Sequence, residues 1–258
     1  MQENRQAHTG HPPVCRARRA PTGINRPDPD TGTGAHRHDD HRIAYVASGV
    51  LSLTTASGTW VAPPAGALWI PAGTAHELRA YGRADLHGAG LPARYDPLGL
   101  DVPAVIAVGP LLRELILAYA REDADPGPVR RRMLGVLLDQ LRVSPLRPLH
   151  LPAPADPRLA AVCALLYANP ADQRGLAALA ADAGAGAGER TLSRLFRTEL
   201  GMTFPQWRTR LRLHRALRLL AAGTPVTAVA HRCGWSSASA FIDVFRRALG
   251  HTPGTHPS

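Results

Sequence analysis

Three histidines in the first third of the chain could act together on one ligand. His36 and His38 are two residues apart, and His76 lies in a later segment. Because residues i and i+2 of a β-strand face the same side, His36 and His38 are expected to point into one interior. Three imidazoles are donors that suit Zn, Fe, Ni or Cu. The three histidines are therefore candidates for a metal site, or for the wall of a small-molecule pocket without a metal.

A second group of chemically useful side chains lies on two predicted helices near the carboxyl terminus. Polar and basic residues face outward on both helices, while leucine and phenylalanine face inward. An arginine can donate two hydrogen bonds to a guanine edge, a serine can bond a base or a phosphate, and an arginine at a helix end is suited to phosphate. The candidate DNA-contacting residues are Arg190, Ser193, Arg194 and Arg197 on the first helix, and Ser236, Ser237, Ser239, Asp243, Arg246 and Arg247 on the second.

The second of these helices belongs to a pattern that covers residues 223–253. Pro225 is typical of the first turn of a helix, and the apolar residues after it recur with helical spacing. Gly234 ends this helix at a position suited to positive φ. The next helix buries Phe241 and Phe245 one turn apart. Two short helices joined by a glycine turn, with a polar and basic outer face, predict a helix-turn-helix unit.

The preceding residues of the carboxyl-terminal half are also predicted to be helical. Amphipathic helices are expected around Leu159 and Leu176, and one long helix is expected from Thr203 to Ala222. The long helix spans ~30 Å. Adjacent major-groove faces on one side of a duplex are ~34 Å apart. We therefore expect this helix to hold two recognition helices in successive major grooves.

The amino-terminal half has a different pattern. Residues 35–95 contain short β-prone runs separated by Gly and Pro, which predicts a small barrel or sandwich. Residues 103–142 are helical in pattern, with two apolar stripes that must be buried on the barrel, on each other or on a second subunit. Residues 1–33 have few large apolar side chains and are expected to be a disordered tail. The proline-rich stretch 143–155 is expected to be a semi-rigid linker.

The carboxyl-terminal pattern resembles the signature of the AraC/XylS family of transcription regulators almost position by position. The matching residues are Gly223, Pro225, Val226, Val229, Ala230, Gly234, Trp235, Ser237, Ser239, Phe241, Phe245, Arg246, Arg247, Gly250 and Pro253. A cupin-like sensor domain often precedes these helices in the family, and here residues 36–38 and 66–76 resemble the two cupin motifs. The resemblance implies a two-domain α+β fold, with a cupin-like β-barrel and two flanking helices at 34–142 and an all-α domain with two helix-turn-helix units at 156–258.

The sequence departs from the family patterns at two places. Metal-binding cupins carry a Glu four or five positions after the second His, where this chain has Arg42 and Ile43. The fourth metal ligand is therefore missing or replaced. In the carboxyl-terminal domain, the turn Gly184–Gly188 is longer than is usual in the family, and a glycine stands where a serine usually caps the following helix.

Charge and cysteine content narrow the class of protein. The 258 residues include 30 Arg and no Lys, and the formal net charge is +10. From residue 156 onward there are 13 Arg against 6 Asp and Glu, so the excess charge is denser where the helix pairs are predicted. Cys15, Cys163 and Cys233 imply no disulfide framework, and no apolar run is long enough to span a bilayer. We expect a cytoplasmic protein without a membrane partner.

These features together predict a sequence-specific DNA-binding transcription regulator and not an enzyme. The expected partners are double-stranded DNA, a second copy in a homodimer, a small-molecule effector bound by the cupin-like domain and, from the family resemblance, RNA polymerase. No cofactor is expected beyond a candidate divalent metal at the three histidines. The alternative is a metal-dependent cupin enzyme of the dioxygenase or isomerase type with secondary DNA binding, against which the incomplete ligand set argues.

Overall fold

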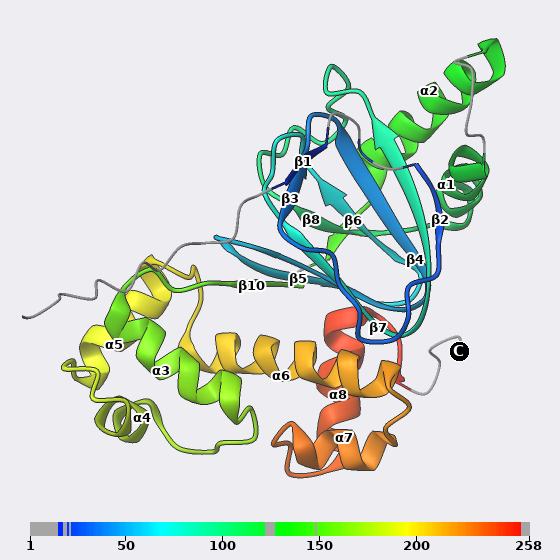
Figure 1. The fold of residues 1–258 in the computed structure, drawn as a ribbon. Helices are drawn as coiled ribbons and strands as arrows, with labels where there is room; N and C mark the ends of the chain where they lie inside the picture. The colour runs from blue at the N-terminus through cyan, green and yellow to red at the C-terminus, as the bar shows by residue number, and fades with distance from the viewer. Residues whose placement is uncertain (1–14, 18–19, 21, 122–126, 148, 254–258) are drawn as a thin grey trace, which may run out of the picture.

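The computed structural model describes residues 15–17, 20, 22–121, 127–147 and 149–253, which form a β-rich amino-terminal domain and a helical carboxyl-terminal domain (Figure 1). The strands are β1 (Cys15–Ala17), β2 (Gly23–Asn25), β3 (His36–His38), β4 (His41–Thr55), β5 (Gly58–Ala62), β6 (Gly66–Ile70), β7 (Glu77–Leu91), β8 (Ala104–Ala107), β9 (Leu146–Arg147) and β10 (His150–Pro152). The helices are α1 (Pro110–Arg121), α2 (Pro128–Val143), α3 (Pro157–Ala168), α4 (Leu176–Asp182), α5 (Glu189–Thr198), α6 (Phe204–Ala221), α7 (Val226–Arg232) and α8 (Ala238–Leu249). None of these helices is long and apolar enough to cross a membrane.

The long strand β4 is the centre of the β domain. It pairs antiparallel with β5, β6 and β7, and the sheet continues to β10 beyond β5 and to β8 and β9 beyond β6. Its register with β7 shifts twice between Val46 and Val50, where Gly49 has a φ of 75°. Such bulges bend a strand and increase its twist, so β4 can pair with β6 along one half and with β5 along the other.

Helices α1 and α2 cover one face of this sheet. Ile43, Tyr45 and Trp69 are fully buried there and pack in one cluster with Ile116 of α1 and Leu141 of α2. Most of the apolar side chains of the two helices are thus buried on the sheet and on each other, whereas Leu111 of α1 is exposed. The predicted helical region 103–142 was wrong at its start, because residues 104–107 form β8 and pair with β6.

Two segments predicted to lack regular structure also contain strands. In the predicted tail, β1 pairs with β3, β2 pairs with β7, and Ala20 is buried; residues 1–14 lie outside the described part of the chain. In the predicted linker, β9 pairs with β8 and β10 pairs with β5. The predictions of a disordered tail and of a linker both rested on amino-acid composition. Composition cannot predict the hydrogen bonds that a segment makes to a strand far away in the sequence.

The opposite face of the sheet packs against the helical domain. Leu53 and Leu86 of the sheet belong to the same buried cluster as Leu217 of α6 and Phe241 and Phe245 of α8. Helix α6 runs along this side of the sheet, between the pair α4–α5 and the pair α7–α8 (Figure 1). The two domains therefore share one hydrophobic core.

Hydrogen bonds to β10 add to this contact. The indole Nε1 of Trp207 donates to the carbonyl oxygen of Pro152 at 3.4 Å, and a guanidinium nitrogen of Arg210 donates to the carbonyl oxygen of His150 at 3.0 Å. The ring of His150 in turn stacks on Trp60 of β5, with centroids 4.1 Å apart. Strand β10 is thus held by the sheet on one side and by α6 on the other.

The two domains approach each other closely at Gly82 in β7. Gly82 has a φ of 68°, and a Cβ built on it would collide with the backbone carbonyl of Ala221 at the end of α6. Gly73 offers a matched comparison, because its φ is 78° and a Cβ there would meet nothing within 4 Å. Of these two glycines, Gly82 alone serves both the backbone conformation and the contact between domains.

We expect Gly82→Ala to destabilise the protein more than Gly73→Ala. Each substitution places a Cβ on a left-handed residue, which costs about 1–2 kcal/mol. At Gly82 the domains must also shift apart, which should remove about 1–3 kcal/mol more of the free energy of unfolding. Urea unfolding of the full chain measures both variants, and equal losses would show that the Gly82–Ala221 contact does not constrain the interface.

Candidate DNA interface and ligand pocket

The first helix pair consists of α4, a glycine-rich turn and α5. Leu192 and Phe196 of α5 are fully buried, while Arg190, Arg194 and Arg197 are exposed about one turn apart. None of these three guanidinium groups makes a hydrogen bond or an ion pair within the described residues. Three cations are thus presented along one face of α5. The fourth predicted contact in this helix, Ser193, is half-buried.

The start of α5 agrees with the sequence analysis. Gly188 is the N-cap residue and provides no side-chain hydrogen bond to the helix. The turn before it contains Gly184 and Gly186, both with positive φ. Glycines therefore supply the conformation that this longer turn requires.

The second helix pair consists of α7, a tight turn at Gly234 and α8. Ser237 is the N-cap of α8, and its hydroxyl oxygen accepts a hydrogen bond from the backbone N–H of Ala240 at 3.1 Å. Of the predicted DNA contacts, Ser237 thus has a structural role as well. The remaining predicted residues of this pair, Ser236, Ser239, Asp243, Arg246 and Arg247, are all exposed.

Electrostatics differ between the two helix pairs. Asp243 accepts a hydrogen bond from Arg246 at 3.1 Å and forms an ion pair with Arg247 at 3.8 Å. The two cations at the end of α8 are therefore partly neutralised within their own helix, although exposed pairs of this kind are weak. The three arginines of α5 have no such partner in the described structure.

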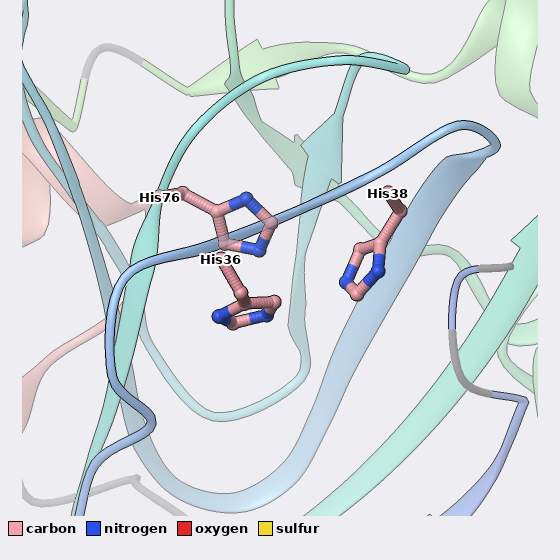
Figure 2. A group of neighbouring side chains, drawn as sticks. All are labelled: His36, His38 and His76. Atoms are coloured by element: carbon pink, nitrogen blue, oxygen red, sulfur yellow. The ribbon is translucent and has the colours of Figure 1, made fainter. Parts of the chain in front are cut away.

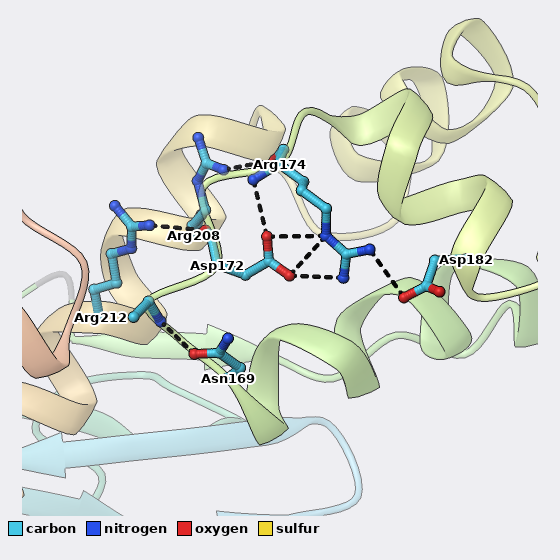
Figure 3. A network of polar contacts seen from close by, with 7 residues as sticks. Asn169, Asp172, Arg174, Asp182, Arg208 and Arg212 are labelled. Carbon is cyan, nitrogen blue, oxygen red and sulfur yellow. Dashed lines mark hydrogen bonds and ion pairs between the residues drawn. The ribbon is translucent and has the colours of Figure 1, made fainter.

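Sequence analysis missed the role of two other arginines in this domain. Arg212 of α6 donates to the carbonyl oxygen of Pro170 at 2.9 Å. It also donates to the carbonyl oxygen of Asp172 at 3.0 Å, and Arg208 donates to that of Arg174 at 3.0 Å (Figure 3). These bonds fasten the loop between α3 and α4 to α6. The guanidinium groups of Arg208 and Arg212 thus bind main-chain carbonyls within the protein. These carbonyls are far away in the sequence, so no pattern of neighbouring residues predicts the hydrogen bonds.

The same loop also touches both helix pairs. Arg174 forms ion pairs with Asp172 at 2.7 Å and with Asp182 at the end of α4 at 3.0 Å (Figure 3). The side-chain amide of Gln173 donates to the carbonyl oxygen of Gly234 at 2.5 Å. A single loop therefore links α4, α6 and the turn of the second helix pair, and so helps to fix their relative positions.

A cavity of about 750 Å³ opens in the β domain. One wall is the interior of the sheet, and the other is the segment that contains β2 and the chain up to β3. Its lining residues are Thr22, Gly23, Ile24, Asn25, Pro27, Thr31, Gly32, Thr33, Gly34, Ala35, His36, His38, Arg42, Ala44, Leu51, Leu78, Ala80, Leu86, His87 and Gly88. Part of the predicted tail is therefore a wall of the cavity.

The three predicted histidines lie together (Figure 2), and two of them, His36 and His38, line this cavity. One ring nitrogen from each of His36, His38 and His76 lies within 4.8 Å of the others. The backbones of His36 and His76 exchange two hydrogen bonds, of 2.9 and 2.8 Å, which bring β3 and the start of β7 together. The alternation of His36 and His38 along one strand face, predicted from the sequence, thus places both rings in one cluster.

Hydrogen bonds determine which ring atoms are free. Nδ1 of His76 lies 2.8 Å from the carbonyl oxygen of Thr74, and Nδ1 of His36 lies 2.8 Å from that of Gly34. A carbonyl only accepts, so each Nδ1 carries the proton. Nε2 of His76 and both ring nitrogens of His38 are buried without a partner in the described structure.

Burial keeps His38 and His76 neutral. It lowers the pKa of His38 to about 4, with a further contribution from the positive charge of Arg42, and it lowers the pKa of His76 to about 4 against the hydrogen bond to Thr74. At neutral pH these two imidazoles therefore offer lone pairs and N–H groups rather than positive charge.

The side chains present do not complete a metal site of the cupin type. No Asp, Glu or Cys joins the three histidines among the described residues. Arg42, at the position where metal cupins carry a Glu, lines the same cavity. His41 is directed elsewhere, because its Nδ1 accepts from the N–H of Ala72 and its ring stacks on Trp69. A guanidinium group beside the imidazoles repels a divalent cation.

Comparison with known proteins agrees with both halves of this structure. Residues 20–141 match a family model described as an AraC-like ligand binding domain, and residues 179–256 match one described as a helix-turn-helix domain. The chain is 34% identical over 227 residues to the HTH-type transcriptional regulator NimR of Escherichia coli (strain K12), a match that covers 86% of this chain and 81% of NimR.

Two further proteins match a smaller share of the chain. The HTH-type transcriptional regulator RipA of Corynebacterium glutamicum is 38% identical over 173 residues, which cover 66% of this chain and 50% of RipA. The crystal structure of the DNA-binding domain of AdpA with a target DNA is 37% identical, covers 38% of this chain and 86% of that chain, and has a TM-score of 0.35. The chain belongs to the AraC family of transcriptional regulators, with an AraC-like ligand-binding domain followed by a helix-turn-helix DNA-binding domain.

Proposed function

We propose that this regulator binds a specific operator through two helix-turn-helix units and senses a small molecule in the cavity of its β domain. The observation that supports this most is the shared core. Leu51, Ala80 and Leu86 line the cavity, and all three belong to the buried cluster that contains Leu217 of α6 and Phe245 of α8. A ligand that displaces this wall must also shift side chains against the DNA-binding helices, because protein interiors are close-packed.

The two helix pairs, α4–α5 and α7–α8, are the proposed helix-turn-helix units. Helix α6 has 18 residues, so it spans ~27 Å, compared with ~34 Å between successive major grooves on one side of a duplex. We assign base reading mainly to α5, since its exposed arginines are unpaired in the described structure. The arginines of α8 share Asp243 and are assigned to phosphate.

The proposed β domain is a cupin-like barrel that extends on both sides of the range 34–142. Its strands run from β1 to β10, so its boundary with the DNA-binding domain falls between Pro152 and Pro157. We propose that the domain binds a ligand and has no enzymatic activity. Stoichiometric metal with substrate turnover after purification from metal-replete medium would favour the cupin-enzyme alternative. Contact with RNA polymerase stays a prediction from the family resemblance.

We further propose that a second copy of the chain packs on α2. Val129, Val136 and Val143 are exposed at intervals of seven residues, so they form one apolar stripe along the helix. This stripe is separate from Leu137 and Leu141, which are buried against the sheet. Its occupant is proposed to be the same stripe of a partner in a homodimer.

Arg194→Ala and Arg247→Ala should weaken DNA binding in different ways. Loss of a bidentate base contact at Arg194 should cost about 1–3 kcal/mol on the operator and relax the preference at about one or two base pairs. Loss of a phosphate contact at Arg247 should weaken binding to all sequences alike and lower the salt slope by about one. Titrations of operator and scrambled duplexes at several salt concentrations test this, after selection of bound sequences from a random pool. The opposite pattern would reverse the two assignments.

Replacement of His36, His38 and His76 together by Ala should leave the operator affinity of the ligand-free protein nearly intact. All three side chains line or border the cavity and none lies on a DNA-binding helix. The triple variant should lose the change in operator affinity that an effector causes in the wild type. Gel shifts with a correctly folded variant, checked by circular dichroism, measure both properties. A comparable loss of ligand-free DNA binding would contradict this separation of roles.

Val136→Glu should convert the dimer to a monomer. A carboxylate buried at the centre of an apolar stripe would lose its hydration without gaining a partner. Val102→Glu is the matched control, because Val102 is also exposed but lies in the loop before β8. Light scattering after size-exclusion chromatography gives both masses. A wild-type monomer, or a Val136→Glu dimer, would exclude this surface as the dimer contact.

A further inference from the structure

The cavity of the β domain has an unusual balance of charge. Among its described lining residues Arg42 is the one arginine, and none is Lys, Asp or Glu. Arg42 lies on β4 and faces the cavity together with Ala44, while Ile43 between them packs on the opposite side of the sheet. The polar part of the lining thus includes the guanidinium group of Arg42 and the neutral imidazole of His38.

The guanidinium group of Arg42 has no partner in the described part of the chain. Its Nε is buried without a hydrogen bond, and no ion pair includes it. Burial lowers the pKa of Arg42 only to about 10, so the group stays charged at neutral pH. A buried charge without a partner is strongly unfavourable. A residue of this kind that opens onto a cavity is suited to receive the missing partner from a ligand.

That partner should be an anion rather than a metal ion. A divalent cation would be repelled by Arg42, whereas a carboxylate can accept two parallel hydrogen bonds from one guanidinium group. His38 has two buried ring nitrogens without a partner, and a neutral imidazole keeps one N–H that can donate to the same carboxylate. Arg42 and His38 therefore offer complementary donors at one end of the cavity.

The rest of the wall is suited to a hydrocarbon body. Leu51, Leu78 and Leu86 line the cavity with Ala44 and Ala80, and the volume of about 750 Å³ is within the range of ~300–1,000 Å³ for small-molecule sites. We propose that the effector is an apolar monocarboxylate, with its carboxylate on Arg42 and His38 and its hydrocarbon part against these leucines. This inference rests on the proposed function of the cavity as the effector site.

Calorimetric titration of the full chain with matched acids and amides tests the class of ligand. The probes are octanoate, decanoate, benzoate and naphthoate, each with its primary amide, and zinc chloride alone. At least one carboxylate should bind with one site per chain, and its amide should bind about tenfold more weakly or worse, because the amide loses the charge-assisted hydrogen bonds. Binding of no carboxylate, or equal binding of an acid and its amide, would overturn the proposal. Stoichiometric zinc that is lost on replacement of the three histidines would do the same.

Two variants locate the interaction. Arg42→Gln should remove the preference for the acid over the amide, and Arg42→Lys should restore part of it because the positive charge returns. Arg37→Gln is the matched control, since Arg37 is exposed on β3 between His36 and His38; it should keep the full preference. An acid preference that persists in a folded Arg42→Gln protein would overturn the assignment.

DNA binding is measured separately with the same proteins. Arg42→Gln should bind the operator as the wild type does, because Arg42 lies outside the DNA-binding helices. The protein could bind the carboxylate through Arg42 without any change in operator affinity when the carboxylate is added. That result would contradict the proposed effector function, while the inference about the class of ligand would stand. A protein whose operator affinity responds only to uncharged ligands would contradict the inference alone.

Discussion

The packing of the β-sheet on α6 and on the second helix pair is the contact on which the arrangement of this protein depends. Leu86 of the sheet, Leu217 of α6 and Phe245 of α8 belong to one buried cluster. At Gly82 and Ala221 the two backbones approach so closely that a side chain has no room. Protein interiors are close-packed and hard to compress, so a shift of one wall moves the side chains packed on it. The position of the DNA-binding helices is therefore tied to the shape of the sheet.

The arginines of the helical domain divide into two groups by their surroundings. Arg208 and Arg212 donate to main-chain carbonyls of the loop that joins α3 and α4, and Arg174 pairs with two aspartates. The planar guanidinium group suits this role, since it carries several donors in a fixed geometry. Arg190, Arg194 and Arg197 point to solvent without a partner in the described structure. Net charge alone would overstate the number of cations available to DNA.

The cavity combines features that a folded core normally avoids. Polar atoms of His38, His76 and Arg42 are buried without partners in the described residues, while the opposite wall is aliphatic. Buried polar groups that lack partners are unfavourable and are rare outside functional sites. The aliphatic residues Leu51, Ala80 and Leu86 of the cavity belong to the same buried cluster as side chains of α6 and α8, so the cavity and the helical domain share one core.

The sequence by itself determined the features that consecutive residues specify. The spacing of Phe241 and Phe245 and the glycine at 234 predicted the second helix pair, and strand alternation predicted that His36 and His38 would face one interior; both agree with the structure. The division into a β-rich domain and a helical domain followed from the change in periodicity between the two halves.

Tertiary structure alone decided which distant segments meet. Residues 22–33 were expected to be part of a disordered tail, yet several of them line the cavity, and the proline-rich stretch supplies β10, which pairs with β5. The pairing of Arg246 and Arg247 with Asp243, and the use of Arg212 to fasten a loop, also became clear only in the fold. The periodicity of apolar residues predicts which face of a single helix or strand is buried. A sheet edge, a carbonyl or a carboxylate far away in the sequence becomes a partner only when the chain has folded.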